Sequence, residues 1–206
     1  MLSETRSTRH RVQLDRGAVR VRVWAPPGRF AFQTPAGSVI DLGCIFELSV
    51  DAEGSARVRV DTGWVELAND WGESLVPAGA SSTMAAAFKP GVPIYDDAPA
   101  MFAANVRTLE RTSDDAARVR AIGAIVASAR VRDVLTLLVL ADAAPPGARR
   151  PLLTRAARLF PPPADVSVEA ILAGERDQLW RWYGALDVPP AKSWWLNWRD
   201  ALPRPR

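Results

Sequence analysis

The sequence predicts an α+β protein whose strands and helices are segregated. We expect an antiparallel all-β domain of the jelly-roll or β-roll type at 10–95, an α-helical domain at 97–188, and a tail at 189–206. Glycine-containing turns recur every seven to eleven residues between 43 and 79, and the runs between them alternate apolar with polar residues. This alternation places every second side chain on one face of a strand. After 97, apolar residues recur three and four positions apart, which is the helical period.

Five short runs make up the predicted β core, and turns that contain aspartate, asparagine and glycine separate them. The runs are Val39–Leu42, Ile45–Leu48, Val58–Val60, Trp64–Leu67 and Ser74–Val76. Trp64 begins one of them and is expected in the core. Residues 80–88 are the expected last strand, and the proline-rich residues 90–99 mark the domain boundary.

Two further strands are predicted ahead of this core, after a disordered lead at 1–9. The first contains Val12 and Leu14, and the second contains the valines at 19, 21 and 23. Residues 15–17 (Asp-Arg-Gly) suit a three-residue hairpin connection between the two strands. Residues 29–33 then form another strand, after a break at two prolines.

The helical domain is predicted from apolar periodicity and from capping residues. Ser113 is the expected N-cap of the second helix, Ser167 that of the fifth, and Gly174 the expected stop of the fifth. Met101 and Val119 are assigned to buried stripes. The predicted helices cover 97–110, a segment opened by Ser113, 131–143, 149–160, 167–172 and 177–186.

Composition indicates ordinary globular material, with 48% hydrophobic and 24% charged residues in a chain of 206. No run approaches the ~20 apolar residues that span a bilayer. The basic excess lies at 1–24 and 192–206, and residues 25–191 are acidic on balance, so we expect no nucleic-acid partner. The single cysteine, Cys44, excludes an internal disulfide and is expected to be a small buried hydrophobe.

An ordered pattern runs from Phe30 through Thr34-Pro35, Val39 and Asp41-Leu42-Gly43 to a closing Leu-Val-Pro-Ala-Gly at 75–79. This ordered set resembles the FecR family, extracytoplasmic regulator domains named after the ferric-citrate signalling protein. The helical half also resembles an extension that follows such domains. The resemblance implies a periplasmic or extracytoplasmic β domain that passes a signal across the membrane to an anti-sigma protein partner. Membrane contact is then expected only through a segment that this chain does not contain. The structural motif residues are Thr34, Pro35, Asp41, Leu42, Gly43, Phe46, Gly54, Gly63 and Gly79.

Two groups of side chains are candidate contacts. Four arginines alternate with strand valines and must point away from them, forming either a solvated sheet face or a surface for an anionic partner. Tryptophans make up the second group. Trp71, in an Asn-Asp-Trp-Gly turn, suits a glycan, and those of the tail either dock back on the protein or contact a partner or a membrane interface. These candidates are Arg20, Arg22, Arg57, Arg59, Trp71, Trp194, Trp195 and Trp198.

Groups that would converge for catalysis are hard to find in the sequence. His10 is the only histidine, so a histidine-based triad or metal site would need the N-terminal end to lie against a pocket. Asp41 is expected to bind turn amides and not to act as a base. We therefore expect no enzyme, no metal and no cofactor. The expected function is a non-enzymatic FecR-like regulatory or sensing domain; the alternatives are a glycan-binding β module that uses exposed tryptophan and a cytoplasmic scaffold protein.

Overall fold

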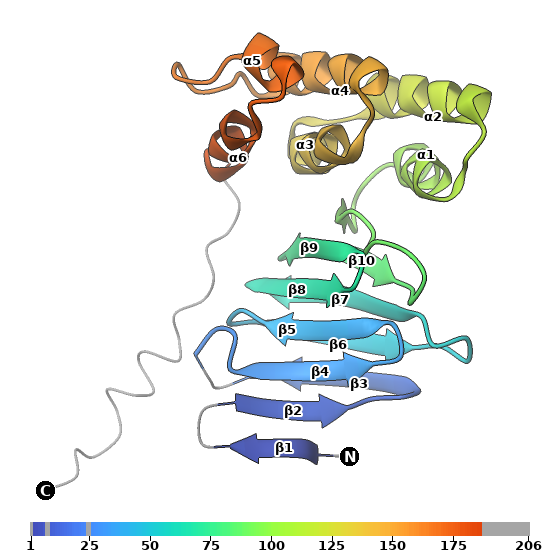
Figure 1. Cartoon of the computed structure of the whole chain (residues 1–206), viewed down its shortest axis with the longest axis vertical. Helices are drawn as coiled ribbons and strands as arrows, with labels where there is room; N and C mark the ends of the chain where they lie inside the picture. Colours follow the sequence, from blue (N-terminus) through green and yellow to red (C-terminus); the bar gives the residue numbers. More distant parts are fainter. Residues whose placement is uncertain (1, 7–8, 24–25, 187–206) are drawn as a thin grey trace, which may run out of the picture. The chain divides into compact units, whose positions relative to one another are not determined.

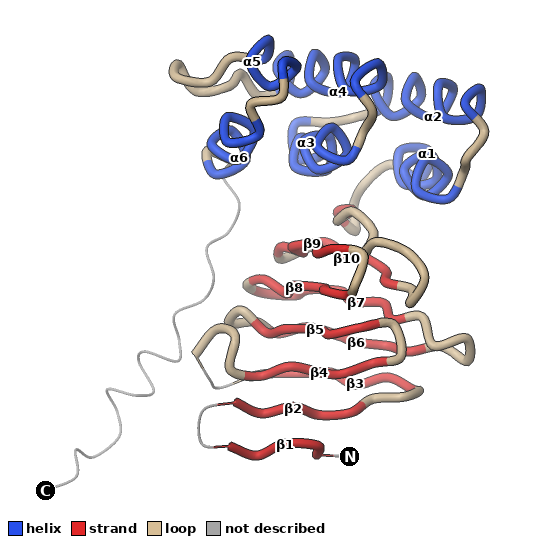
Figure 2. The backbone as a smooth tube through the Cα atoms, viewed as in Figure 1, coloured by secondary structure: helices blue, strands red, loops and turns tan. Residues whose placement is uncertain are grey.

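The computed structural model describes residues 2–6, 9–23 and 26–186, and it confirms the α+β layout. The chain divides after Pro93 into a β unit and a helical unit, the latter covering Ile94–Asp187. The β unit contains the ten strands β1 to β10 among its described residues. Figure 2 shows these strands in red and the helices of the second unit in blue. The two-residue strand β11 (Ile94–Tyr95) opens the helical unit.

Two sheets lie face to face in the β unit (Figure 1). The first has the order β1-β2-β4-β5-β8-β9, and within the β unit the second has the order β10-β7-β6-β3. The strands of the first sheet are β1 (Leu2–Arg6), β2 (Arg9–Gln13), β4 (Phe30–Thr34), β5 (Gly37–Asp41), β8 (Trp64–Asn69) and β9 (Gly72–Pro77). Those of the second are β3 (Gly17–Arg22), β6 (Ile45–Val50), β7 (Ala56–Thr62) and β10 (Ala80–Met84).

The predicted hairpin between the first two runs is wrong. β2 belongs to the first sheet and β3 to the second, so residues 15–17 carry the chain from one sheet to the other. β2 instead pairs in parallel with β4, with His10 opposite Phe30. Among the described strands, the β2–β4 pair is therefore parallel and the other pairs of the β unit are antiparallel. A turn sequence predicts that the chain reverses direction. Which strand then pairs with β2 depends on how the apolar faces of both sheets are buried.

The inner faces of the two sheets form the core of the β unit. Phe32 of β4 meets Phe46 of β6 edge to face, with ring centroids 6.2 Å apart, so aromatic packing joins the sheets. The alternating residues of β7 show the pattern: Ala56, Val58 and Val60 are buried, and the arginines that alternate with them are exposed. The predicted alternation of the core strands is confirmed.

Three predictions for the β unit need correction. Residues 2–6 form β1, paired with β2, where a disordered lead was expected. Trp64 is only half-buried, because Val65 and Leu67 take the inward positions of β8. The last strand, β10, ends at Met84, and Phe88 lies in the following loop with a 67% exposed side chain.

The helical unit contains six α-helices among its described residues, and one 3-10 turn, η1 (Val131–Asp133). Apolar residues of α1, α2, α3, α4 and α6 make its core, with Trp182 of α6 fully buried. The helices are α1 (Ala100–Arg111), α2 (Asp115–Ser128), α3 (Val134–Ala143), α4 (Pro146–Leu159), α5 (Val168–Ala173) and α6 (Arg176–Gly184).

The ends of α5 confirm the capping analysis. The Ser167 hydroxyl accepts a hydrogen bond from the backbone of Ala170, and Gly174 ends the helix in the left-handed conformation. The N-cap of α2 is Asp114, which accepts from Ala117, and not Ser113. Asp and Ser are comparable caps, so adjacent candidates are separated only by where the helix begins.

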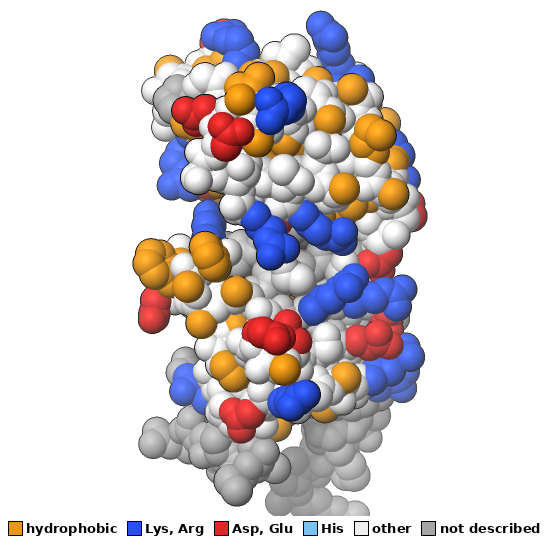
Figure 3. Space-filling model, turned by 90° about the vertical axis from the view of Figure 1, so that its right-hand side faces the viewer, with side chains coloured by type: hydrophobic (Ala, Val, Ile, Leu, Met, Phe, Trp, Pro, Cys, Tyr) orange, Lys and Arg blue, Asp and Glu red, His pale blue; other side chains and the backbone are white. Residues whose placement is uncertain are grey.

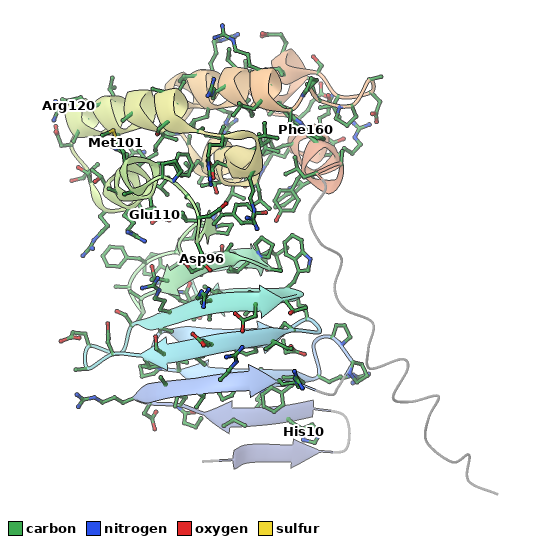
Figure 4. All side chains as sticks on the ribbon, turned by 180° about the vertical axis from the view of Figure 1, so that it is seen from behind. His10, Asp96, Met101, Glu110, Arg120 and Phe160 are labelled. Carbon is green, nitrogen blue, oxygen red and sulfur yellow. The ribbon has the colours of Figure 1, made fainter. Side chains whose placement is uncertain are left out.

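Two residues assigned to buried stripes are exposed. The side chains of Met101 and Val119 are 67% and 71% exposed, and Figure 4 labels Met101 on α1. Neither residue lies on the buried side of its helix, which carries Phe102, Val106 and Leu109 in α1 and Ala121, Ile122 and Ile125 in α2. Among the described residues, no helix combines the length and apolar character needed to cross a bilayer.

Candidate functional site

The Asp41 carboxylate is buried at the end of β5 and holds the turn that follows. It accepts hydrogen bonds from the backbone N–H groups of Gly43 at 3.2 Å and of Cys44 at 2.9 Å, and from the Cys44 thiol. Burial raises the pKa of Asp41 above its ordinary value of 3.8, although the hydrogen bonds act in the opposite direction. The prediction that Asp41 binds turn amides is confirmed.

The glycines of the motif bring turns together. Gly63 has a φ of +76°, and a Cβ there would overlap the carbonyl oxygen of Gly43. Gly54 lies less closely against Pro35, since a Cβ there would be 3.0 Å from the Cβ of Pro35. The close approach of Gly63 to the turn at Gly43 therefore needs a residue without a side chain.

Several other motif residues also have structural contacts. The Thr34 hydroxyl donates to Gly37 O at 2.9 Å and accepts from the backbone N–H of Ala36. Phe46 is fully buried, and the backbone N–H of Leu42 donates to Trp64 O. The backbone N–H of Gly79 donates to Val60 O at 2.7 Å.

The outward face of β3, β6 and β7 carries three of the four predicted arginines in two neighbouring rows, while Arg22 lies further along β3, opposite Ile45. In one row Arg20 lies opposite Glu47, which lies opposite Arg59. In the next row Ala18 lies opposite Ser49, which lies opposite Arg57. We call the set formed by Arg20, Glu47, Ser49, Arg57 and Arg59 the arginine face.

A shallow depression of about 420 Å³ lies on the arginine face. The small side chains of Ala18 and Ser49 explain it, because the adjoining row carries long side chains on all three strands. Arg20, Arg57 and Arg59 border the depression against a single acid, Glu47. The sequence placed these arginines on one outer surface, and the strand register brings three of them to one depression.

The arginines of this face differ in how their charge is compensated. Arg20 donates to Asp61 at 2.7 Å, and Arg59 lies 3.9 Å from the other oxygen of that carboxylate. Arg57, and the exposed Arg22 outside this face, form no ion pair with a side chain in the part of the chain that the structure describes. The positive charge is therefore partly uncompensated near Arg57. One face of the molecule in Figure 3 likewise shows basic side chains lying among acidic ones.

Trp71 lies in the turn between β8 and β9, and its side chain is 63% exposed. Its ring Nε1 donates to Ala86 O at 3.0 Å, and its backbone N–H donates to the side-chain oxygen of Asn69 at 3.0 Å. The same Asn69 side chain donates to Phe88 O at 2.8 Å. The exposed ring is thus held in place by the turn and by the loop after β10.

Searches among protein-family models, curated proteins and solved structures found no match to this chain.

A charged cluster in the helical unit was missed by the sequence analysis. Arg130 forms a two-point contact with Asp133, at 3.0 and 3.1 Å, and lies 3.3 Å from Asp97. Arg132 lies 3.2 Å from Asp97 and 4.3 Å over the ring of Tyr95. These hydrogen bonds, chiefly those from Arg130, hold the pKa of Asp97 below its ordinary value. The contact between Arg130 and Asp97 joins residues 33 positions apart, so no local pattern in the sequence predicts it.

The remaining candidates are distributed without convergence in the part of the chain that the structure describes. His10 is in β2, as Figure 4 shows. It lines neither the depression on the arginine face nor a second depression, which lies beside Arg107 and Arg111 of α1. No described histidine, cysteine or acid belongs to a group of three suited to a metal ion. Trp24 and the tail tryptophans, Trp194, Trp195 and Trp198, lie outside the described residues.

Proposed function

We propose that this protein is a non-enzymatic regulatory or sensing module of the FecR-like kind, and that its β unit recognises a protein partner through the arginine face. The residues quoted for the FecR resemblance favour the regulatory role, in an extracytoplasmic domain that signals to an anti-sigma partner. The single observation that carries the binding mode is the convergence of Arg20, Arg57 and Arg59 on one depression.

The chemistry of this depression favours an acidic, extended segment. Arg57 and Arg59 project from the same face of β7, and residues two apart on a strand are about 6.8 Å apart. Carboxylates at alternate positions of an extended peptide have the same spacing. Arginine also forms two parallel hydrogen bonds with a carboxylate. The contact is therefore specific in its geometry and does not rest on charge attraction alone.

A peptide of alternating glutamate and serine tests this binding mode. We expect saturable binding to the full chain by fluorescence anisotropy, weakening as ionic strength rises because exposed charges are screened. The double substitution Arg57→Gln/Arg59→Gln should weaken binding about tenfold or more, while leaving thermal stability unchanged, since both side chains are exposed.

The matched control removes the same charge elsewhere. Arg107 and Arg111 are exposed on α1, four residues apart, so Arg107→Gln/Arg111→Gln lowers the net charge equally without touching the arginine face. Equal weakening in both double variants would mean that binding follows net charge alone, and would contradict the proposal. The signalling part is tested separately: interaction of the chain with an anti-sigma factor encoded beside it, in a two-hybrid assay, supports it, and its absence counts against it.

A further inference from the structure

The turn that presents Trp71 combines exposure with rigidity. The ring is 63% exposed, yet its only polar group is occupied by Ala86 O, so the surface left to solvent is aromatic carbon. Leaving such a surface in water is unfavourable. The turn and the loop after β10 nevertheless fix the ring there, and burial does not explain this order. An exposed ring fixed in this way is suited to contact with a flat, partly apolar ligand.

Further exposed side chains belong to the turn and to the loop that hold the ring. Phe88 is 67% exposed in the loop whose carbonyl group accepts from Asn69. The aliphatic part of Lys89 lies over Gly72, since a Cβ on Gly72 would be 3.2 Å from Lys89 Cε. Asp70 and Glu73, on either side of Trp71 and Gly72, are exposed. The turn and the loop that hold the ring therefore also carry an ammonium donor and two carboxylate acceptors.

We propose that Trp71 is a stacking platform for a neutral β-linked glucose or N-acetylglucosamine unit of a polysaccharide. In these sugars the ring substituents are equatorial, so the axial C–H groups leave a flat apolar face that matches an indole. Hydroxyl groups at the rim of the sugar can donate to Asp70 or Glu73 and accept from Lys89. The two acids against one lysine disfavour an anionic polysaccharide.

This site is independent of the arginine face. Trp71 belongs to the turn between two strands of the first sheet, and the arginines belong to the second. A protein partner that bound this ring would be expected to cover a larger apolar area than Trp71, Phe88 and the small side chains of Ala86 and Ala87 supply. A sugar needs only the ring and a few hydrogen-bonding groups.

The test uses the full chain with cellohexaose and with the N-acetylglucosamine hexamer, and follows binding by calorimetry. We expect binding of at least one of these oligosaccharides and none of oligogalacturonate. Trp71→Ala should weaken binding about 30-fold, as truncation of a central aromatic contact does. Trp71→Phe, which keeps an aromatic face and loses the bond to Ala86, should weaken it less.

Trp180→Ala is the matched control, because Trp180 is also an exposed tryptophan, 51% exposed on α6. The centroid of its ring lies 5.7 Å from that of Tyr183. This variant should bind as the wild type does. An unchanged melting temperature in Trp71→Ala shows that the loss does not come from unfolding.

Absence of binding to both neutral hexamers, or equal binding by wild type and Trp71→Ala, would overturn the proposal. Self-association that depends on Trp71, without oligosaccharide binding, would assign the ring to a second copy of the chain and would overturn it as well.

Discussion

The Asp41 carboxylate and Cys44 are joined by two hydrogen bonds, one from the backbone N–H at 2.9 Å and one from the thiol. Both side chains are fully buried, at the point where β5 leaves the first sheet and the chain enters β6 of the second. Where the chain crosses between sheets, the backbone N–H groups of Gly43 and Cys44 are buried and have no partner in a neighbouring strand. The Asp41 carboxylate stabilises the crossing because it accepts from both of them. Five predictions follow from this and related contacts.

Replacing Asp41 by alanine should lower the free energy of unfolding of the β unit by about 3 kcal/mol, because two buried N–H groups lose their acceptor. Denaturant unfolding measures this loss. Asp51→Ala is the control: Asp51 also accepts from two backbone groups, of Glu53 and Ser55, but it is exposed and water can replace it. A comparable loss in both variants would contradict the importance of burial.

The contribution of Asp41 to stability should fall as pH rises. Its pKa is raised above 3.8 in the folded state, so between these values the folded protein binds more protons than the unfolded chain. The free energy of unfolding therefore decreases with pH across this window and is constant above it. The measurement is the difference between wild type and Asp41→Asn from pH 3 upward; a difference that grows with pH would contradict the raised pKa.

Cys44 should be inert in the folded protein. Burial, and next the adjacent Asp41 carboxylate, raise the pKa of the thiol, and only the thiolate is a good nucleophile. An aromatic disulfide reagent should react with Cys44 only after denaturant unfolds the β unit. Rapid labelling of the native protein, at the rate of a small-molecule thiol, would show that the turn opens or that the thiol is accessible.

Gly63→Ala should destabilise the β unit by about 3 kcal/mol or more, because φ is positive and the new Cβ would overlap Gly43 O. Gly123→Ala gives the contrast. Gly123 is exposed within α2 and a Cβ there meets nothing within 4 Å, so the substitution should stabilise the helix by about 1 kcal/mol. Thermal unfolding measures both; the same sign for the two variants would contradict the assignment.

Asp97 should show the opposite pH dependence from Asp41. Its pKa is lowered, first by the hydrogen bonds from Arg130, so its contribution is present above 3.8 and is lost as pH falls through the lowered value. Wild type should exceed Asp97→Asn in stability of the helical unit at neutral pH, and the two should converge in acid. High salt should reduce the neutral-pH difference, since Asp97 is half exposed. A pH-independent difference would contradict the ion pairing.

Local signals in the sequence predicted the elements that depend on neighbouring residues. The alternation in 56–60 predicted the strand that became β7, and Ser167 with Gly174 marked both ends of α5. The outward orientation of Arg57 and Arg59 followed from the valines between and beside them. Such features depend on residues two to four positions apart, and these spacings are the same in any tertiary context.

Partners far apart in the sequence were decided by the tertiary structure alone. Residues 15–17 have hairpin composition, but β2 pairs with β4, because burial of both sheets outweighs a turn preference. Trp64 was assigned to the core as the first residue of a strand, yet the register of β8 directs Val65 inward instead. The contact of Arg130 with Asp97 and the bond from Trp71 to Ala86 also needed the folded chain.

The sequence by itself determined that the chain has strands before Pro90 and helices after Asp97, and which faces of those strands are apolar. The tertiary structure decided that three arginines share one depression and that the ring of Trp71 is fixed in the open. Periodicity reports which side of an element meets the core. It does not report which elements become neighbours, because that choice depends on packing the whole interior at once.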